Sequence, residues 1–258
     1  MKEKGQVTMF IIAGVVIVAI IIAFILISNR ANIPFLAKSP DINPNSYLTS
    51  CIEKDLRKNL ELISLQGGHL ENKLNLTYEF KDLGKIDVSY LCYQQNSYFG
   101  CINQNPLLIY TFENEIEKGI SSEMQTCFDS LIKDMKDSGA EVSEKYGGFE
   151  VKIMQDKVRI KINAEINYQK QDDLKSYKEI ELNFLSKSYD LVNLAEEITS
   201  QEGRFCNFES TGYMLLYPGI DITKLRTSGS ELIYTLIEKE TQEKFIFAIR
   251  GCVIPPVM

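Results

Sequence analysis

The six cysteines are the side chains that offer this sequence its most definite chemistry, either disulfide formation or metal binding. They are Cys51, Cys92, Cys101, Cys127, Cys206 and Cys252. A structural zinc site is disfavoured, because no two cysteines have C-x-x-C spacing and the chain has a single histidine. Their even number instead indicates disulfides formed in an oxidising compartment.

Position along the chain favours particular pairs, although the sequence alone leaves other pairings open. Cys92 and Cys101 bracket an apparent turn, so a disulfide between them would close a small loop. Cys51 and Cys127 hold equivalent places on two predicted helices, and would join them if the helices pack side by side. The two remaining cysteines then form the third pair.

The residues that commonly catalyse reactions do not form a recognisable active site. His69, the only histidine, lies between Gly68 and Leu70 at a predicted helix-to-strand turn. The chain has no G-x-S-x-G sequence that would supply the serine of a catalytic triad. Phosphate-binding glycine motifs are absent. The acid pairs Asp172-Asp173 and Glu196-Glu197 have polar neighbours and are expected on solvated faces. We therefore expect no catalytic residue, metal or cofactor, with a hydrolase built from scattered residues as the alternative.

Asn75-Leu76-Thr77 is an N-x-T sequon in a predicted strand. The alternation of that strand places Asn75 on its polar side, where a glycan can be carried if the domain is extracellular. Asn75 is thus a candidate glycosylation site.

Residues 9–28 form an unbroken apolar run without a charge. About 20 residues at about 1.5 Å each match the hydrocarbon thickness of a bilayer, so the run predicts a transmembrane helix. It is longer than the apolar part of a secretory signal peptide, and no small-x-small cleavage pattern follows it. The lipid bilayer is therefore an expected partner, with residues 1–8 as a short leader.

The sequence Lys4-Gly5-Gln6 in front of this run resembles the class III signal peptides of archaeal type IV pilins and related surface proteins. The resemblance implies cleavage between Gly5 and Gln6 by a pilin-type peptidase, with the apolar helix retained and other surface-filament subunits as partners. Filament-forming members usually carry Glu at the fifth mature position, where this chain has Phe10. An unprocessed single-pass anchor is the alternative interpretation.

Orientation follows from the cysteines more than from the charges that flank the run. Lys2 and Lys4 precede it, while Arg30 and Lys38 follow it, so the positive-inside bias is slight. An even set of cysteines beyond the apolar run indicates an oxidising exterior. We expect a cytoplasmic amino terminus, with residues 31–258 extracellular.

The overall charge excludes one class of partner. The net charge is −7, and no cluster of Lys and Arg interrupts it. Binding to nucleic acid needs a basic surface to neutralise phosphates, so nucleic acid is not an expected partner. The ligand itself cannot be named from the sequence.

The hydrophobic pattern predicts an extended, proline-containing stalk over residues 29–45 and an α+β domain over 46–258 with a mainly antiparallel sheet. The predicted helices cover residues 46–66, 112–137 and 188–199. The predicted strands cover residues 70–80, 140–145, 149–153, 158–168, 180–184, 213–217, 220–225, 231–237 and 244–250.

Helix followed by strand occurs twice, over residues 46–80 and 112–153. Each helix carries one cysteine and ends in glycine. This pattern is interpreted as a weak internal duplication, with two unrelated amphipathic helices as the alternative. Together, the sequence predicts a non-catalytic membrane-anchored surface protein, either pilin-like or a receptor or adhesin module.

Overall fold

The computed structural model describes residues 14–22, 42–71, 74–96, 99–171, 173–229 and 231–251. The chain divides into two units, Met1–Asp41 and Ile42–Met258. In the first unit residues 14–22 are helical, and across the described ranges no helix combines the length and apolar character needed to cross a membrane. The predicted cleavage site at Gly5 and Gln6, the rest of the 9–28 run and most of the predicted stalk lie outside the described residues.

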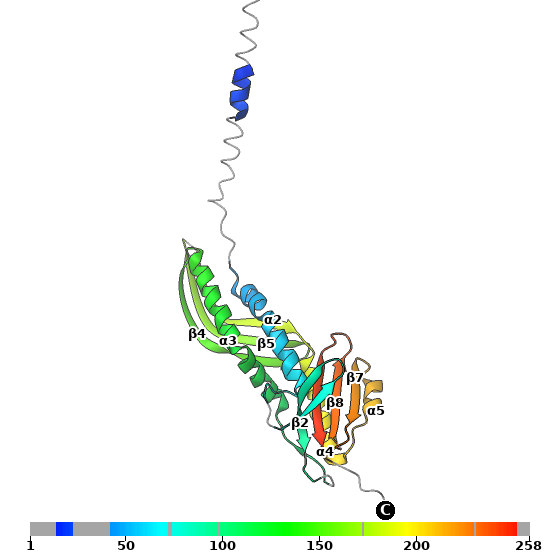
Figure 1. Ribbon diagram of the computed structural model, residues 1–258. Coiled ribbons are helices and arrows are strands. Elements are labelled where there is room, and N and C mark those ends of the chain that lie inside the picture. The colour runs from blue at the N-terminus through cyan, green and yellow to red at the C-terminus, as the bar shows by residue number, and fades with distance from the viewer. Residues whose placement is uncertain are drawn as a thin grey trace, which may run out of the picture. The chain divides into compact units, whose positions relative to one another are not determined.

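The second unit has α+β architecture, as predicted (Figure 1). Its helices are α2 (Pro44–Leu65), α3 (Leu108–Asp137), α4 (Ser188–Phe205) and α5 (Ser210–Leu216). Its strands are β1 (Asn75–Phe80), β2 (Gly84–Tyr93), β3 (Ile102–Asn103), β4 (Glu141–Met154), β5 (Lys157–Lys170), β6 (Asp173–Leu185), β7 (Ile220–Arg226), β8 (Glu231–Glu238) and β9 (Lys244–Arg250).

Helix α2 forms because its apolar residues recur every three to four positions and are buried along one face. These residues are Leu48, Ile52, Leu56, Leu60 and Ile63. The Asn43 side chain accepts hydrogen bonds from the first turn, and Pro44 occupies a position where its missing N–H costs nothing. The last residues of the predicted stalk therefore belong to this helix.

Glycine ends α2 for a steric reason as well as a conformational one. Gly67 has a φ of +70°, which favours glycine. A Cβ added there would also lie 3.0 Å from the Cβ of Ser89 in β2. This close approach allows the turn after α2 to pack against the sheet.

Helix α3 runs antiparallel beside α2 and begins four residues before its predicted start at 112. Its own N-cap residue, Leu107, makes no side-chain capping bond. Instead, Glu196 of α4 accepts hydrogen bonds from the backbone N–H groups of Leu108 (2.9 Å) and Ile109 (3.4 Å). A residue distant in sequence thus extends the helix.

The strands form two sheets, where the sequence predicted one mainly antiparallel sheet. The first sheet has six strands in the order β1-β2-β9-β8-β7, with β3 added to β2. Its β2–β9 pair is parallel and its other pairs are antiparallel, so the sheet is mixed. The second sheet is antiparallel, in the order β4-β5-β6. The parallel pair joins strands far apart in sequence, which local patterning cannot reveal.

One predicted turn is instead part of a strand. Residues 140–145 and 149–153 were expected as separate strands around Gly147 and Gly148, but they form the continuous strand β4. Pairing with β5 continues on both sides, with a register shift between Tyr146 and Phe149. Gly148 has a φ of +85°, so the two glycines form a bulge and do not end the strand.

Two other predictions were wrong in type or missed an element. Residues 213–217 were expected as a strand, but Ser210–Leu216 forms α5, where the Glu209 side chain accepts a hydrogen bond from the N–H of Thr211. The strand β2 was not predicted, because the short turn before Gly84 was not recognised as part of a hairpin. The β1–β2 register places Phe80 opposite Gly84.

The domain has a main core between the helices and both sheets, and a smaller one under the β1–β2 hairpin. The first half of β2 pairs only with β1, and its Ile86 and Val88 pack with Ile233 of β8 and Ile246 of β9. The hairpin therefore covers the second face of β8 and β9. Such burial on both faces explains the nearly continuous apolar run of β9.

Candidate functional site

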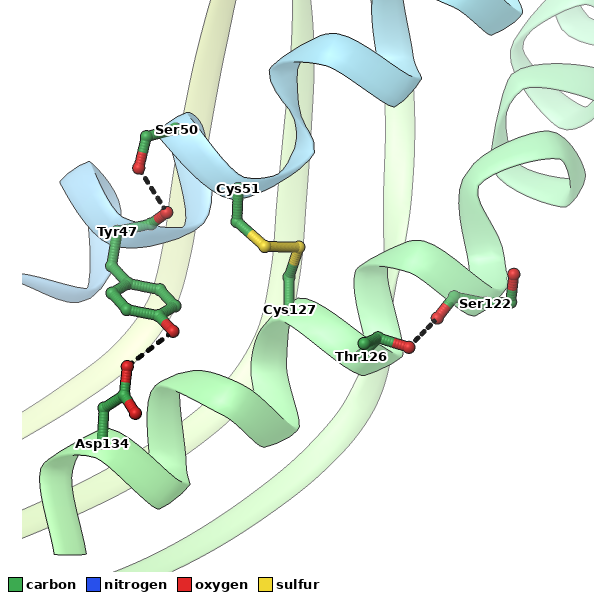
Figure 2. Close-up of a disulfide and its surroundings, with 7 residues drawn as sticks. All are labelled: Tyr47, Ser50, Cys51, Ser122, Thr126, Cys127 and Asp134. Atoms are coloured by element: carbon green, nitrogen blue, oxygen red, sulfur yellow. Dashed lines mark hydrogen bonds between the residues drawn. A yellow bond between two sulfur atoms is a disulfide. The ribbon is translucent and has the colours of Figure 1, made fainter. Parts of the chain in front are cut away.

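The Cys51–Cys127 disulfide joins α2 to α3, as the sequence had suggested for these two cysteines (Figure 2). Its Cα atoms are 5.9 Å apart and its residues are separated by 76 positions. Cys51 lies on the exposed side of α2, whereas Cys127 is buried. In the chain-entropy description a loop of this length is worth about 4 kcal/mol.

A hydrogen bond reinforces this junction one turn earlier in α2. The Tyr47 hydroxyl donates to Oδ2 of Asp134 in α3 at 2.8 Å (Figure 2). Partial burial, and then the hydrogen bond to Asp134 and its charge, raise the pKa of Tyr47. The first two turns of α2 are therefore fastened to α3 by one covalent and one polar contact.

The second disulfide, Cys92–Cys101, closes the loop between β2 and β3, as predicted. Both cysteines are buried. A Cβ on Gly100 would lie 2.5 Å from the carbonyl oxygen of Gly203, so only glycine allows the loop to pack on α4. Figure 1 shows the carboxyl end of β2 at the end of the domain opposite the first turn of α2. We refer to it as the distal end.

Three large apolar side chains are exposed on the segments that meet at the distal end. Phe99, Ile102 and Phe205 have exposed fractions of 61%, 63% and 72%. We refer to these three residues as the distal patch. Phe99 lies within the disulfide-closed loop, whereas Ile102 belongs to β3 and Phe205 ends α4. Exposed apolar residues that gather at one end of a domain are a candidate contact surface.

A buried charged network holds the carboxyl end of α4 against the first sheet. Glu202 has a side chain only 2% exposed, and its Oε1 accepts hydrogen bonds from Lys224 Nζ at 2.7 Å and from the Tyr234 hydroxyl. Burial, followed by the hydrogen bond to Glu202, raises the pKa of Tyr234. The segment that carries Phe205 is thus fixed by a fully paired carboxylate.

The third cysteine pair is only partly within the described residues. Cys206 follows α4 directly, in a left-handed backbone conformation with a φ of 55°. It is also disulfide-bonded. Its predicted partner, Cys252, lies outside the described part of the chain.

The residues weighed for catalysis are dispersed, and several have structural contacts. His69 is half-buried, with its Nε2 3.5 Å from Asn105 Nδ2, and burial lowers its pKa. Asp173 pairs with Lys175 at 3.4 Å. Glu196 was expected on a solvated face, but its carboxylate caps α3. His69, Asp173, Glu196 and Glu197 line neither of two cavities of the described residues, the groove beside α2 and a hollow beside the carboxyl half of α3.

Two further glutamates have a structural role that the sequence analysis missed. Glu117 accepts a hydrogen bond from the backbone N–H of Val151 at 2.7 Å, and Glu113 accepts one from that of Ile153 at 3.1 Å. Both donors belong to β4, an edge strand of its sheet. The carboxylates of α3 thus occupy outward-pointing donors of that edge. The sequence does contain an indication of this role. Glu113 and Glu117 are four residues apart, so they lie on the same side of α3, and Glu113 is adjacent to the buried Phe112.

Asn75 is exposed at the start of the edge strand β1, on the polar side predicted for it. The hydroxyl of Thr77, the third sequon residue, donates to Asp87 Oδ1 at 2.5 Å. The position is accessible for modification, and glycosylation stays a prediction.

No group of three or more His, Cys, Asp or Glu residues within the described ranges has the geometry to hold a metal ion. Comparison with protein-family models, curated proteins and solved structures gives no match for this chain. The function of the domain is therefore inferred from its own residues and contacts.

Proposed function

We propose that this chain is a membrane-anchored cell-surface protein whose disulfide-stabilised α+β domain binds or assembles with a partner and is not an enzyme. The observation that carries the proposal is the pair of disulfides in a domain that follows the apolar run of residues 9–28. Disulfides persist in oxidising compartments, which supports a position for this domain on the outer side of a membrane.

The attachment of α2 supports a tethered domain. The chain enters the domain at residue 42, next to α2, and the contacts through Tyr47 and Cys51 fasten this entry point to α3. A helix at a chain entry would otherwise fray from its first turn, because terminal turns have the fewest tertiary contacts. The entry is thus suited to carry an anchor.

The hydrogen bonding of three carboxylates that join elements of the fold favours binding over catalysis. Glu113, Glu196 and Glu202 each accept hydrogen bonds that hold two elements together. A general acid or base must instead be free to exchange a proton with a substrate in a cavity. These acids stabilise the fold, and the distal patch is the surface of the fold that we propose contacts a partner.

The resemblance to class III signal peptides adds a processing step to the proposal. Cleavage after Gly5 would leave the apolar helix on the mature protein, whether as a membrane anchor or as part of a filament. Phe10, in place of the usual Glu, favours an anchored receptor or adhesin module over a filament subunit.

Topology can be tested with a membrane-impermeant, lysine-reactive biotin reagent on intact cells. We expect the protein in the membrane fraction, labelled on lysines of residues 42–251 without permeabilisation. A soluble protein, or labelling that requires permeabilisation, would contradict the proposal.

Processing can be tested by intact mass of the protein extracted from those membranes. Loss of residues 1–5 is expected for pilin-type cleavage, and a full-length mass would reject that step while leaving the anchor in place. Electron microscopy of the cell surface then distinguishes a filament subunit from a single module.

A further inference from the structure

A groove with a volume of about 330 Å³ lies between four segments of the domain. One wall is a face of α2 and another is the turn between β8 and β9. The junction of β6 and α4, with Leu83 of the β1–β2 turn, completes the lining. The distal end and both described disulfides contribute no residue to it.

The floor of the groove is formed by three hydroxyl groups on buried residues. Ser64, Ser186 and Ser188 are 7%, 5% and 5% exposed. Ser186 Oγ donates to Glu243 Oε2 at 2.9 Å and lies 2.8 Å from Ser188 Oγ. Ser64 Oγ has no hydrogen-bond partner among the described residues. This oxygen is not among the enclosed side-chain atoms that lack a partner, so solvent reaches it and the hydroxyl can bond to water or to a ligand in the groove.

The walls carry four charged side chains, and two of them already have polar partners within the protein, Arg57 in an ion pair and Glu243 in hydrogen bonds. Arg57 pairs with Glu53 at 2.7 Å. Glu243 accepts hydrogen bonds from Ser186 Oγ and from the backbone N–H of Lys187, both at 2.9 Å. Both side chains therefore have polar partners within the protein when no ligand is bound.

The remaining two charges have opposite signs and come from different segments that line the groove. Glu61 belongs to the wall formed by α2, and Lys244 begins β9 on the wall formed by the β8–β9 turn. Neither has an ion pair within the described ranges. The lining of the groove therefore includes a carboxylate, an ammonium group and a hydroxyl, none of which has an ion-pair or hydrogen-bond partner among the described residues.

We propose that this groove binds a free α-amino acid with a small aliphatic side chain. The ligand's ammonium group is matched by Glu61 and its carboxylate by Lys244, with Ser64 as a further hydrogen-bond partner. Leu60, Leu65 and Leu83 supply apolar surface for the side chain. None of the described lining residues is aromatic, so a stacking surface for sugars or bases is missing. This inference concerns a site separate from the proposed anchoring and from the distal patch.

The test uses the full chain in detergent micelles and L-valine as the probe, followed by ligand-observed NMR titration up to about 10 mM, because small ligands with few contacts bind weakly. We expect saturable binding. N-acetyl-L-valine lacks the ammonium group and L-valinamide lacks the carboxylate, so each should bind about tenfold more weakly, since a hydrogen bond to a charged group is lost.

Single variants test the role of each charged residue in ligand binding. Glu61→Gln should weaken L-valine binding about tenfold, and so should Lys244→Met. Lys244→Met should leave the already weak binding of L-valinamide unchanged, because that ligand has no carboxylate to lose. Glu79→Gln and Lys81→Met, exposed residues of the β1–β2 hairpin outside the groove, serve as matched controls.

Three results would overturn the inference. They are the absence of saturable binding, equal binding of N-acetyl-L-valine methylamide, which lacks both charges, and full L-valine affinity in both charge variants. Ser64→Ala, which removes only the unpartnered hydroxyl, provides an independent variant that preserves the surface charges. Topology labelling is unaffected by any of these outcomes, so failure here is distinguishable from failure of the proposed function.

Discussion

Replacing Cys51 and Cys127 with alanine should lower the free energy of unfolding by about 4 kcal/mol. The 76-residue separation determines this value, because the cross-link removes conformational entropy from the unfolded chain in proportion to the logarithm of loop length. The same reasoning gives only about 2.5 kcal/mol for Cys92–Cys101, whose separation is 9. The longer loop should therefore dominate the stability that disulfides provide.

Chemical and thermal unfolding of the full chain in micelles, followed by circular dichroism, measures this loss. A domain of this size loses about 2–4 °C in Tm per kcal/mol, so a decrease of about 10 °C or more is expected. Cys51→Ala alone should give nearly the same loss, because Cys51 is exposed and its side chain contributes little burial. This single variant separates the cross-link from packing.

A loss below about 1 kcal/mol in the double variant would refute the reasoning, since it would mean that the unfolded chain is already constrained without the cross-link. So would a Cys51→Ala variant as stable as the wild type. A decrease in the m-value would locate the discrepancy in the unfolded state.

Three further predictions concern single residues. Glu196→Ala should destabilise the domain by about 1–3 kcal/mol, because the N–H groups at the start of α3 lose a charged acceptor, and hydrogen exchange should speed up at Leu108. Leu56→Ala, at a fully buried position of α2, should cost about 2–5 kcal/mol in urea unfolding, whereas a loss below about 1 kcal/mol would mean that the core collapses around the site. Burial, and then the charge of Glu231, raise the pKa of Tyr90 to about 12. The unfolded chain therefore loses this proton first, stability falls as pH rises from about 10 to 12, and Tyr90→Phe should flatten that fall in a pH series of unfolding curves.

Local patterns in the sequence were sufficient for the three long helices α2, α3 and α4 and for most strands. The spacing of Leu48, Ile52 and Leu56 predicted α2, and strict alternation predicted β5, because both signals come from one buried face. The prediction for the α5 region was wrong because its sequence carries no such clear signal. Residues Tyr213 to Tyr217 form a short apolar run in which helix and strand look alike, and capping by Glu209 favours the helix.

The candidate sites were less predictable, because they depend on segments that meet only in the folded chain. The groove is lined by both Glu61 and Lys244, which are far apart in sequence, and no motif marks either residue. Glu196 looked like an ordinary surface acid until α3 was placed beside α4. The disulfide pairs were accessible to sequence reasoning only because each follows a local feature, a turn or a pair of similar helices.

The Cys51–Cys127 cross-link also limits how far this molecule can lengthen when it is pulled. A stretch of 76 residues would extend to about 270 Å at about 3.5 Å per residue if it unravelled. When tension acts between residue 42 and a contact beyond Cys127, such as one at Phe205, it passes through the sulfur–sulfur bond into α3, and the chain between the two cysteines is not stretched. Held between a surface and a bound object, the protein would act as a short, stiff link whose reach is limited by a covalent bond.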